Sequence, residues 1–472
     1  MDSLDNKRVL VVGLARSGLA VAKFLCSQGA RVTITDERSE PLLGTFPQKA
    51  RELGCELALG GHPLEIFSGS DLVVLSPGVP LDLQPLNLAR ERSIPVIGEL
   101  ELACRFLHLP VVAITGTNGK TTTTTLVGTM LEQSGVRTFV GGNIGNPLSN
   151  IFFLENAPEV AVVEVSSFQL DSSSTFHPQV GVLLNISEDH LDRYDSFEEY
   201  VASKCRIFMN QSQTDKAILP AVAPYFMDYG RIRSQHLLFG SKATLAHARV
   251  DSGTLICSMG PGCKVHYDLS QWRLPGRHNL DNLLAAVLAA TSMGARPEAI
   301  QRTIDSFSGL PHRMELICHW RGIRFYNDSK ATNIAAVCSS LASFCDPIIL
   351  IAGGRYKGGP LKSLVPLVNE RVKMLLLMGE ARFEFARVFS SCGCTMVVDS
   401  MERAVREAIA AAVPGDVVLL APACASFDLY ENYEARGDHF RSIVAAVTSE
   451  LRNADGCLET CSLSESSSVS RS

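Results

Sequence analysis

The feature that most constrains the fold of this chain is an apolar strand that leads directly into a loop of glycine, asparagine, lysine and threonine. The strand covers residues 110–114 (PVVAI), the loop covers residues 115–121 (TGTNGKT), and residues 122–132 can continue as a helix. In this order the backbone N–H groups of the loop converge at a helix N-terminus, where phosphate oxygens bind. The pattern therefore predicts a phosphate site at the edge of an α/β sheet.

The loop differs from the usual P-loop, because only two residues separate Gly116 from Gly119. Lys120 supplies a mobile positive charge for the phosphates, and the hydroxyl of Thr121 can ligate a Mg²⁺ ion that the same phosphates hold. The alternative is an ordinary surface turn of an α/β protein. We favour the phosphate site because the strand and the helix that it requires are both present.

The length of 472 residues suggests about three domains, and strand–loop–helix units recur through most of the chain. We expect an α/β protein with a Rossmann-like first domain, a central P-loop-type domain with a mostly parallel sheet, and a Rossmann-like third domain. The expected bounds are 1–99, 100–309 and 310–452, followed by a disordered Ser-rich tail at 453–472.

The first domain begins with a strand at residues 8–12, the sequence GLARSG at 13–18, and a second strand that ends at Asp36. This is close to the dinucleotide-binding fingerprint, with an acidic residue about twenty positions on. Ala15 stands where the middle glycine would let a pyrophosphate approach the backbone. An NAD-dependent dehydrogenase is therefore disfavoured, and a nucleotide half-site of the same architecture fits better.

Composition excludes several classes of partner. The net charge of -6 and the absence of dense Lys/Arg runs give no footprint for nucleic acid. No run approaches the ~18 apolar residues that span a bilayer, and the N-terminus lacks a signal core, so we expect a cytoplasmic protein without a membrane partner. The fourteen cysteines are scattered, and we expect most of them to be reduced and buried.

Two further positions carry candidate metal ligands. Glu164 ends the apolar strand at residues 160–163, and an acid leaving a buried strand beside a phosphate loop is placed to bind Mg²⁺. The alternative is a strand-end acid that faces water. His190 lies in the segment NISEDHLD at 185–192, where four polar or acidic neighbours favour a metal site over a structural histidine.

Eight motifs follow one another in the order typical of the Mur ligase family, which the chain resembles over about residues 5–452. They are TGTNGKTT (115–122), EVSSFQ (164–169), NISEDHLDRY (185–194), PGRHN (275–279), LPHR (310–313), NDSKATN (327–333), PACASFD (422–428) and NYEARG (432–437). The segment at 327–333 discriminates best among the branches of the family. It resembles the branch that joins D-glutamate to UDP-N-acetylmuramoyl-L-alanine.

The resemblance implies ATP-driven amide formation at the cytoplasmic stage of peptidoglycan precursor synthesis. The substrate carboxylate would be phosphorylated to an acyl phosphate, the amine would attack through a tetrahedral intermediate, and phosphate would leave. It also implies small-molecule substrates, ATP and two Mg²⁺ sites. We expect a monomer.

The resemblance also assigns residues to each ligand. Lys120, Glu164, His190 and Lys204 would be catalytic, and Thr121, Glu164, His190 and a carbamylated Lys204 would hold the metal ions. ATP would be bound by Gly116, Thr117, Asn118, Gly119, Lys120, Thr121, Thr122, Asn279, Asn282, Arg313 and Asp328, of which Arg313 and Asp328 would reach it only on domain closure. The UDP substrate would be bound by Ala15, Arg16, Ser17, Asp36, Arg38, Ser76, Pro77, Gly78, Asn143, Ser167 and Gln169. D-Glutamate would be bound by Lys330, Thr332, Lys357, Ser426 and Tyr433.

Several of these assignments have plain structural alternatives. Without the family, Lys204 is expected to be a solvated lysine on a helix. Asn143 is flanked by glycines and could simply form a turn. Lys357 has surroundings that differ from the family motif, so a solvated loop lysine competes there. Tyr433 stands where the family commonly has phenylalanine.

Three other functions remain as rivals at this point. A ligase for a different amino acid, or a folylpolyglutamate synthetase, would share the superfamily and most of the motifs. A non-catalytic nucleotide sensor would bind ATP without needing Glu164, His190 and Lys330 together. The hypothesis of a dehydrogenase depends only on residues 13–18, and Ala15 in place of the middle glycine argues against it.

Overall fold

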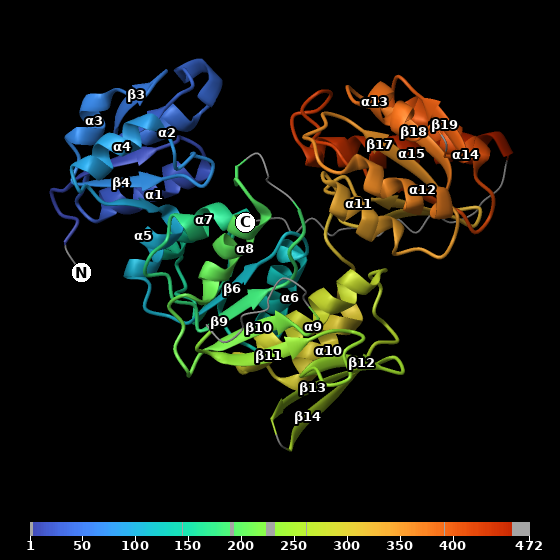
Figure 1. Ribbon diagram of the computed structural model, residues 1–472, viewed down its shortest axis with the longest axis horizontal. Coiled ribbons are helices and arrows are strands. Elements are labelled where there is room, and N and C mark those ends of the chain that lie inside the picture. The colour runs from blue at the N-terminus through green and yellow to red at the C-terminus, as the bar shows by residue number, and fades with distance from the viewer. Residues whose placement is uncertain are drawn as a thin grey trace. The chain divides into compact units, whose positions relative to one another are not determined.

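The computed structural model describes residues 3–143, 145–188, 193–222, 232–260, 262–390 and 392–455 (Figure 1). The chain divides into two compact units. The first contains residues 1–186, 190–271 and 281–306, and the second contains residues 187–189, 272–280 and 307–472. No helix within the described ranges combines the length and the hydrophobicity that crossing a membrane requires.

The first unit opens with a five-stranded, wholly parallel sheet in the order β3-β2-β1-β4-β5. Alternate residues of β1 enter different cores, with Val9 and Val11 on one face and Leu10 and Val12 on the other. Helices therefore cover both faces, as in Rossmann-like folds. The elements are β1 (Arg8–Val12), α1 (Arg16–Ser27), β2 (Arg31–Asp36), η1 (Glu40–Leu43), α2 (Phe46–Glu52), β3 (Glu56–Leu59), α3 (Leu64–Ser68), β4 (Leu72–Leu75), α4 (Gln84–Glu91), β5 (Val96–Gly98) and α5 (Glu99–Phe106).

The second sheet of this unit has nine strands in the order β14-β13-β12-β11-β10-β9-β6-β8-β7. Its strands from β7 to β12 pair in parallel, and β12, β13 and β14 form an antiparallel edge. The strands are β6 (Val111–Thr115), β7 (Thr138–Gly142), β8 (Val160–Glu164), β9 (Val180–Leu183), β10 (Lys216–Pro220), β11 (Gln235–Phe239), β12 (Ala248–Asp251), β13 (Thr254–Gly260) and β14 (Cys263–Asp268). The helices are α6 (Lys120–Gln133), η2 (Leu148–Phe153), α7 (Ser167–Asp171), α8 (Phe197–Cys205), η3 (Arg206–Phe208), α9 (Arg277–Ser292) and α10 (Pro297–Ser306).

Strand order in this sheet places the site. The central strand β6 lies between β8 and β9, with Ile114 opposite Glu164 and Thr115 opposite Leu183. Because the three strands are parallel, the segments that follow them leave at the same edge. Ligands bind at such an edge in open α/β sheets.

The second unit contains a six-stranded sheet in the order β15-β16-β20-β17-β18-β19, antiparallel only between β15 and β16. Successive residues of β17 alternate between two cores, with Leu350 on one face and Ile349 and Ile351 on the other. The elements are β15 (Glu315–Trp320), β16 (Ile323–Asn327), α11 (Ile334–Leu341), β17 (Ile348–Gly353), η5 (Leu361–Leu364), α12 (Val365–Arg371), β18 (Val372–Met378), α13 (Arg382–Val388), β19 (Cys394–Val397), α14 (Met401–Ala411), β20 (Val417–Leu420) and α15 (Tyr433–Asp455).

The predicted fold class is confirmed, because three mostly parallel α/β sheets follow one another along the chain. The predicted domain bounds stay predictions. The helix α15 extends to Asp455, and residues 456–472, most of the predicted tail, lie outside the described residues.

Candidate functional site

The loop between β6 and α6 has the backbone shape of a phosphate cradle. Gly116 and Gly119 adopt φ values of +151° and +86°, and α6 begins immediately afterwards at Lys120. Positive φ values favour glycine at both positions. A side chain at Gly119 would also place its Cβ 2.2 Å from Oδ1 of Asn282. The backbone N–H groups of the loop therefore lie at the N-terminus of α6, and the side chain of Asn282 packs against Gly119 at the same place.

Asn185, two residues after the end of β9, fixes the shape of this loop. Its backbone oxygen accepts a hydrogen bond from the N–H of Thr117 at 2.9 Å. Its side chain accepts one from the N–H of Asn118 and donates one to the oxygen of Asn118, both at 2.9 Å. The side chain of Lys120 folds over the same loop and donates to the carbonyls of Gly116 and Thr117, each at 2.9 Å.

Glu164 is the acidic centre of the site. Its side chain is 2% exposed at the end of β8. One carboxylate oxygen accepts a hydrogen bond from the Thr121 hydroxyl at 2.8 Å, and the other accepts one from the amide of Asn143 at 2.9 Å. Thus the predicted strand-end acid does not simply face water, since it joins the phosphate loop to the loop after β7.

These oxygens fit a Mg²⁺ ion. Adjacent ligands of an octahedral Mg²⁺ ion, at about 2.1 Å from the metal, are about 3.0 Å apart, which is close to the 2.8 Å between the hydroxyl of Thr121 and the carboxylate of Glu164. Within the described ranges, no group of three or more His, Cys, Asp and Glu side chains forms a metal centre of the protein's own. Such a pair suits an ion that nucleotide phosphates also hold. His190 lies outside the described residues.

Lys204 contacts the underside of the phosphate loop. It lies on α8, is 2% exposed, and donates to the carbonyl of Gly116 at 3.1 Å. Its ammonium also lies 4.5 Å from the ring centre of Tyr200, whose hydroxyl is 3.3 Å from that of Thr117. The expectation of a solvated lysine, drawn from the helix pattern alone, is wrong, because α8 packs this side against the loop.

Five other predicted residues lie in or near this sheet, and the structure shows local contacts for several of them. Gln169 completes a capping box with Ser166 at the start of α7, so its side chain orders the helix N-terminus. The carbonyl of Ser167 accepts a hydrogen bond from Ser203 at 3.1 Å. Thr122 is buried in the first turn of α6. Asn279 donates to the carbonyl of Pro275 at 2.7 Å and is grouped with the second unit, whereas Asn282 is grouped with the first.

The predicted UDP residues of the first domain lie at the carboxyl edge of the first sheet. Asp36 is buried, and its carboxylate accepts hydrogen bonds from the N–H of Leu14 at 2.8 Å and from Nε of Arg38 at 2.9 Å. Burial opposes the charge on Asp36, but the bonds from Arg38 and Leu14 outweigh it and lower the pKa of this carboxyl group. A negative Asp36 therefore orders the turn that leads into α1.

The turns after β1 and β4, next to Asp36, are also closely packed. Ser76 donates to the carbonyl of Gly13 at 2.9 Å, and a Cβ at Gly18 would lie 2.0 Å from that same oxygen. Ala15 precedes α1, and Arg16 and Ser17 form its exposed and half-buried first turn. Pro77 and Gly78 follow β4, where the carbonyl of Gly78 accepts a hydrogen bond from Arg193 at 3.1 Å.

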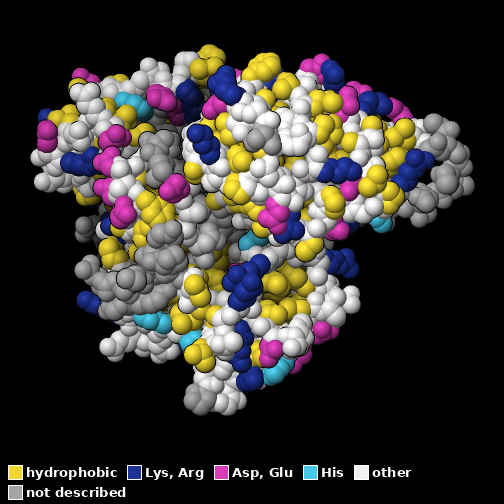
Figure 2. All heavy atoms as spheres, turned by 45° about the vertical axis from the view of Figure 1, so that its right-hand side comes forward, with side chains coloured by type: hydrophobic (Ala, Val, Ile, Leu, Met, Phe, Trp, Pro, Cys, Tyr) yellow, Lys and Arg dark blue, Asp and Glu magenta, His cyan; other side chains and the backbone are white. Residues whose placement is uncertain are grey.

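A cavity of about 440 Å³ lies beside the first turn of α1. Arg16, Lys23 and Lys49 line it together with Glu52, and Asn146 and Asn150 contribute from around the start of the η2 segment. Three positive charges against one negative charge suit an anionic ligand close to the turn at Ala15. On the face drawn in Figure 2, basic and acidic side chains are interspersed over most of the surface.

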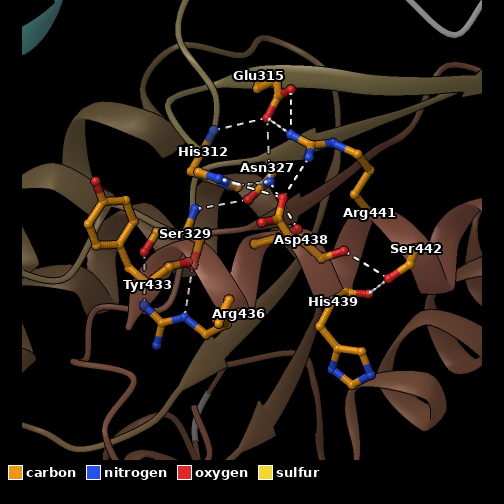
Figure 3. Close-up of polar contacts among 12 residues, drawn as sticks. His312, Glu315, Asn327, Ser329, Tyr433, Arg436, Asp438, His439, Arg441 and Ser442 are labelled. Atoms are coloured by element: carbon orange, nitrogen blue, oxygen red, sulfur yellow. Dashed lines mark hydrogen bonds and ion pairs between the residues drawn. The ribbon is translucent and has the colours of Figure 1, made fainter. Parts of the chain in front are cut away.

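In the second unit, a buried polar network joins the loops that carry the predicted D-glutamate residues (Figure 3). The guanidinium of Arg436, 3% exposed, donates to the hydroxyl of Ser329 at 2.9 Å, to its carbonyl at 2.8 Å, and to the carbonyl of Cys424 at 3.1 Å. Ser329 in turn donates to the carbonyl of Tyr433 at 2.8 Å. Burial lowers the pKa of Arg436 to about 10, so it remains charged at neutral pH.

A second part of this network centres on Asn327 (Figure 3). The amide of Asn327 contacts Nδ1 of His312 at 3.1 Å and donates to the carbonyl of Gly437 at 3.2 Å. The backbone N–H of His312 donates to Glu315 at 2.9 Å, and Arg441 contacts the same carboxylate at 2.7 Å. Burial lowers the pKa of His312, which favours a neutral ring.

The network holds Lys330 beside Tyr433. The ammonium of Lys330 lies 3.9 Å from the ring centre of Tyr433, and its backbone N–H donates to the carbonyl of His312 at 3.1 Å. Thr332 is half-buried two residues later, and Ser426 is 2% exposed in the loop after β20. By contrast, Lys357 is exposed on the loop after β17.

Asp328 is buried directly after β16. It accepts hydrogen bonds from the N–H of Met314 at 3.1 Å and from the hydroxyl of Ser340. Burial outweighs these bonds and the positive charge of Arg313, and raises the pKa of Asp328 to about 6. Arg313 itself is half-buried two residues before the start of β15.

Sequence reasoning assigned no role to Asn185, Tyr200, His312 or Arg436. Asn185, His312 and Arg436 lie in the motifs, whereas Tyr200 lies six residues after the motif at 185–194. Each of the four acts by holding another loop. A strand-end asparagine at 185 was the available signal. The partners of Arg436 lie up to 107 residues away, and no local pattern identifies them.

Comparisons with known proteins indicate one family for three successive parts of the chain. Family models match residues 7–98 (Mur ligase MurD-like, N-terminal domain), 114–290 (Mur ligase middle domain) and 312–424 (Mur ligase, glutamate ligase domain). The UDP-N-acetylmuramoylalanine--D-glutamate ligase of Geotalea uraniireducens is 46% identical over 94% of this chain and 98% of its own length. The enzyme of that name from Pelotomaculum thermopropionicum is 42% identical over 95% and 99%.

Solved structures show the same fold at lower identity. A pseudomurein peptide ligase type C from Methanothermus fervidus is 22% identical with a TM-score of 0.59, covering 94% of this chain and all of its own. MurF ligase from Thermotoga maritima, solved in complex with ADP, is 16% identical with a TM-score of 0.60, covering 96% of this chain and all of its own.

Proposed function

The chain belongs to the Mur ligase family, and on that premise we propose that it joins D-glutamate to UDP-N-acetylmuramoyl-L-alanine, with ATP driving the new amide bond. Relatives of that activity align with nearly all of the chain at 42–46% identity. The structural observation that carries the proposal is the contact between Thr121 and Glu164 at the mouth of the phosphate loop. A nucleotide-dependent transfer needs that pairing of hydroxyl and carboxylate, and a passive turn does not.

ATP is proposed to bind with its phosphates over residues 116–122 at the start of α6. The N–H groups of the loop and the ammonium of Lys120 would neutralise the β- and γ-phosphoryl oxygens. Lys120 already lies over the loop, where phosphate contacts would replace its hydrogen bonds to the carbonyls of Gly116 and Thr117. Asn279, Asn282, Arg313 and Asp328 are proposed to complete the nucleotide site.

A Mg²⁺ ion is proposed to be held by Thr121 and Glu164, where it would neutralise charge on the transferred phosphoryl group. Asn143 donates to the far oxygen of Glu164 and thereby holds the carboxylate in one orientation. His190 and a carbamylated Lys204 are proposed for a second ion. Lys204 is buried against the loop at Gly116, and conversion of its ammonium to a carbamate would replace a buried cation with an oxygen ligand.

The first chemical step makes the acceptor carboxylate reactive. A carboxylate oxygen of the L-alanyl group attacks the γ-phosphorus, ADP leaves, and an acyl phosphate forms. Displacement of oxide from a free carboxylate is not feasible, whereas displacement of phosphate is. Catalysis at this step consists of positioning and charge neutralisation by the loop and Lys120.

The second step uses the amine of D-glutamate. The neutral amine attacks the acyl carbon and a tetrahedral intermediate forms. The nitrogen then loses a proton, the C–O bond to the phosphoryl oxygen breaks, and inorganic phosphate leaves. Lys330, Thr332, Ser426 and Tyr433 are proposed to receive the two carboxylates of D-glutamate, together with Lys357. The ammonium of Lys330 is the main charge partner, because the network through Ser329 and Arg436 holds its loop in place.

The UDP part of the acceptor is proposed to lie at the carboxyl edge of the first sheet. The turn at Ala15, Arg16 and Ser17 would face the diphosphate, and Asp36 with Arg38 would face the uracil. Ser76, Pro77, Gly78, Asn143, Ser167 and Gln169 would line the remainder. We propose that the enzyme works as a monomer in the cytoplasm on small-molecule substrates.

Trapping of the acyl phosphate tests this function. Purified protein with ATP, Mg²⁺, UDP-N-acetylmuramoyl-L-alanine and hydroxylamine, but without D-glutamate, is expected to yield the hydroxamate of the acceptor. A Lys120→Ala variant with an unchanged circular dichroism spectrum should form at least about a thousandfold less, since charge neutralisation at the phosphoryl group is lost. Absence of hydroxamate from the wild-type enzyme would refute the mechanism.

A further inference from the structure

Two cysteines of the first domain lie within reach of one another. Cys26 is in the last turn of α1, and Cys55 follows α2 and immediately precedes β3. Their sulfur atoms are 3.7 Å apart, although 29 positions separate them in the chain. Both side chains belong to the same core cluster of this domain. Neither has any part in the proposed ligase reaction.

The backbone fixes this approach through two similar helix ends. After α1, the N–H of Gly29 donates to the carbonyl of Cys26, and Gly29 has φ +81°. After α2, the N–H of Cys55 donates to the carbonyl of Ala50, and Gly54 has φ +84°. Both are left-handed glycine terminations of the Schellman type, which hold the last turn of a helix in a defined geometry. The two sulfur atoms are therefore placed by ordered backbone.

The two thiols differ in exposure and acidity. Cys26 is partly exposed, whereas Cys55 is 7% exposed. The hydrogen bond between the two thiols lowers the pKa of Cys26 to about 7, against an opposing effect of burial. That hydrogen bond and burial raise the pKa of Cys55. A partly exposed thiolate next to a buried thiol is the arrangement of an attacking and a resolving cysteine.

We propose that Cys26 and Cys55 are a modification site, at which hydrogen peroxide converts the two thiols into a reversible intramolecular disulfide. The Cys26 thiolate attacks one peroxide oxygen, the O–O bond breaks, and hydroxide leaves to give a sulfenic acid. The Cys55 thiol then attacks that sulfur, and the sulfenic oxygen departs as water. The two sulfurs lose two electrons, and the peroxide is reduced to two water molecules.

The geometry requires little movement. A disulfide bond is about 2.05 Å long, so the sulfur atoms must approach by less than about 2 Å, which side-chain rotation can supply. The bond would close a loop that contains β2, and with it Asp36 and Arg38 at the proposed uracil side. Oxidation would thus restrain the segment that carries this part of the substrate site.

Peptide mapping tests the proposal on the full-length protein. Treatment with hydrogen peroxide, alkylation of the remaining thiols and digestion should yield a linked peptide that joins Cys26 to Cys55, about 2 Da lighter than the two thiol peptides together. Dithiothreitol should restore both thiols. Cys338 is an internal control, because it is also partly exposed but burial raises its pKa. It should remain fully alkylatable under conditions that link the pair.

Two variants separate the roles of the sulfurs. Cys55→Ser should accumulate the sulfenic acid at Cys26, detectable with dimedone, because nothing resolves it. Cys26→Ser should leave Cys55 alkylatable and the ligase turnover unchanged. The proposal is overturned if the wild-type protein shows Cys26 and Cys55 still alkylatable when Cys338 is already oxidised, or if Cys26 proceeds to the sulfinic acid without a linked peptide.

Discussion

At the scale of single residues, Lys330 carries the most direct claim about substrate choice. Its ammonium lies over the ring of Tyr433, and its loop is fixed by the bonds of Arg436 to Ser329. The ring of Tyr433 and the fixed loop hold the ammonium of Lys330 in a defined position. A dianionic amino acid gains more from such a charge than a nucleotide that binds at the other loops.

Substitution of this lysine should therefore act on one substrate. We expect Lys330→Ala to raise the KM for D-glutamate about 10- to 100-fold, because a charge-assisted hydrogen bond is lost. The KM for ATP should change less than about threefold. Steady-state phosphate release measures both. Lys362→Ala, an exposed lysine of the same domain, is the matched control and should change neither. Equal increases for both substrates would contradict the assignment.

Asp328 makes a prediction about pH. Its pKa, raised to about 6 by burial, is higher in the folded than in the unfolded chain. The folded state therefore binds more protons between about pH 4 and pH 6, and its free energy of unfolding falls as the pH rises through that range, by about 3 kcal/mol. Above about pH 6 the whole of this decrease in the free energy of unfolding has occurred.

The Asp328→Asn variant should lack this slope, because an amide of the same shape does not titrate. Urea unfolding followed by the fluorescence of Trp320, in β15 of the same sheet, measures the difference between pH 4.5 and pH 7. The wild-type protein should lose more stability than the variant on going to pH 7. Identical pH dependences would show that the carboxyl group is not protonated in the folded state at pH 4.5.

Some residue-level features could be predicted from sequence and others could not. Glu164 follows a run of apolar β-formers, and that local signal placed it at a strand end. Burial of Lys204 was missed without the family, because a lysine on a short helix gives no local sign of which face packs. The pairing of Cys26 with Cys55 depends on how two helix ends meet, which neither segment encodes alone.

At the scale of elements, the phosphate loop depends on the glycine that precedes α6. Gly119 combines a positive φ with close packing against Asn282. Gly135, after the other end of the same helix, has nearly the same φ of +89° but open space around its Cα. The two positions therefore separate backbone strain from steric conflict.

Alanine at each position tests this distinction. Gly135→Ala should cost about 1–2 kcal/mol of stability from the left-handed conformation alone and leave kcat/KM for ATP within about twofold. Gly119→Ala carries the same strain and must also displace Asn282, so kcat/KM for ATP should fall at least about a hundredfold. Thermal unfolding and phosphate release are the measurements. Similar kinetic effects of the two substitutions would show that the packing against Asn282 is not needed.

Element positions were the most predictable part of the fold. The strands expected at residues 8–12, 110–114 and 160–163 occur at 8–12, 111–115 and 160–164, because short apolar runs near glycine or proline leave few alternatives. The order of strands in each sheet was not predictable in this way. The contact of Asn185 with the phosphate loop follows from β9 lying next to β6, which is a property of the whole sheet.

At the scale of the whole molecule, three sheets supply the three groups of loops that the proposed reaction uses. The first sheet presents the loops for the UDP part, the second the phosphate loop, and the third the loops around Lys330. Their succession along the chain was predictable from the repeated strand–loop–helix units. The polar network around Arg436 was not, because it joins loops about a hundred residues apart.

An amino-acid panel tests the central claim most directly. Phosphate release by the purified protein with ATP, Mg²⁺ and UDP-N-acetylmuramoyl-L-alanine should require D-glutamate and should yield one amide product per phosphate. L-Glutamate, L-alanine, L-lysine and diaminopimelate should each support less than about a hundredth of that rate, since their charged groups do not meet the same loops. A rate with any of these four that matches or exceeds the rate with D-glutamate would contradict the proposed function.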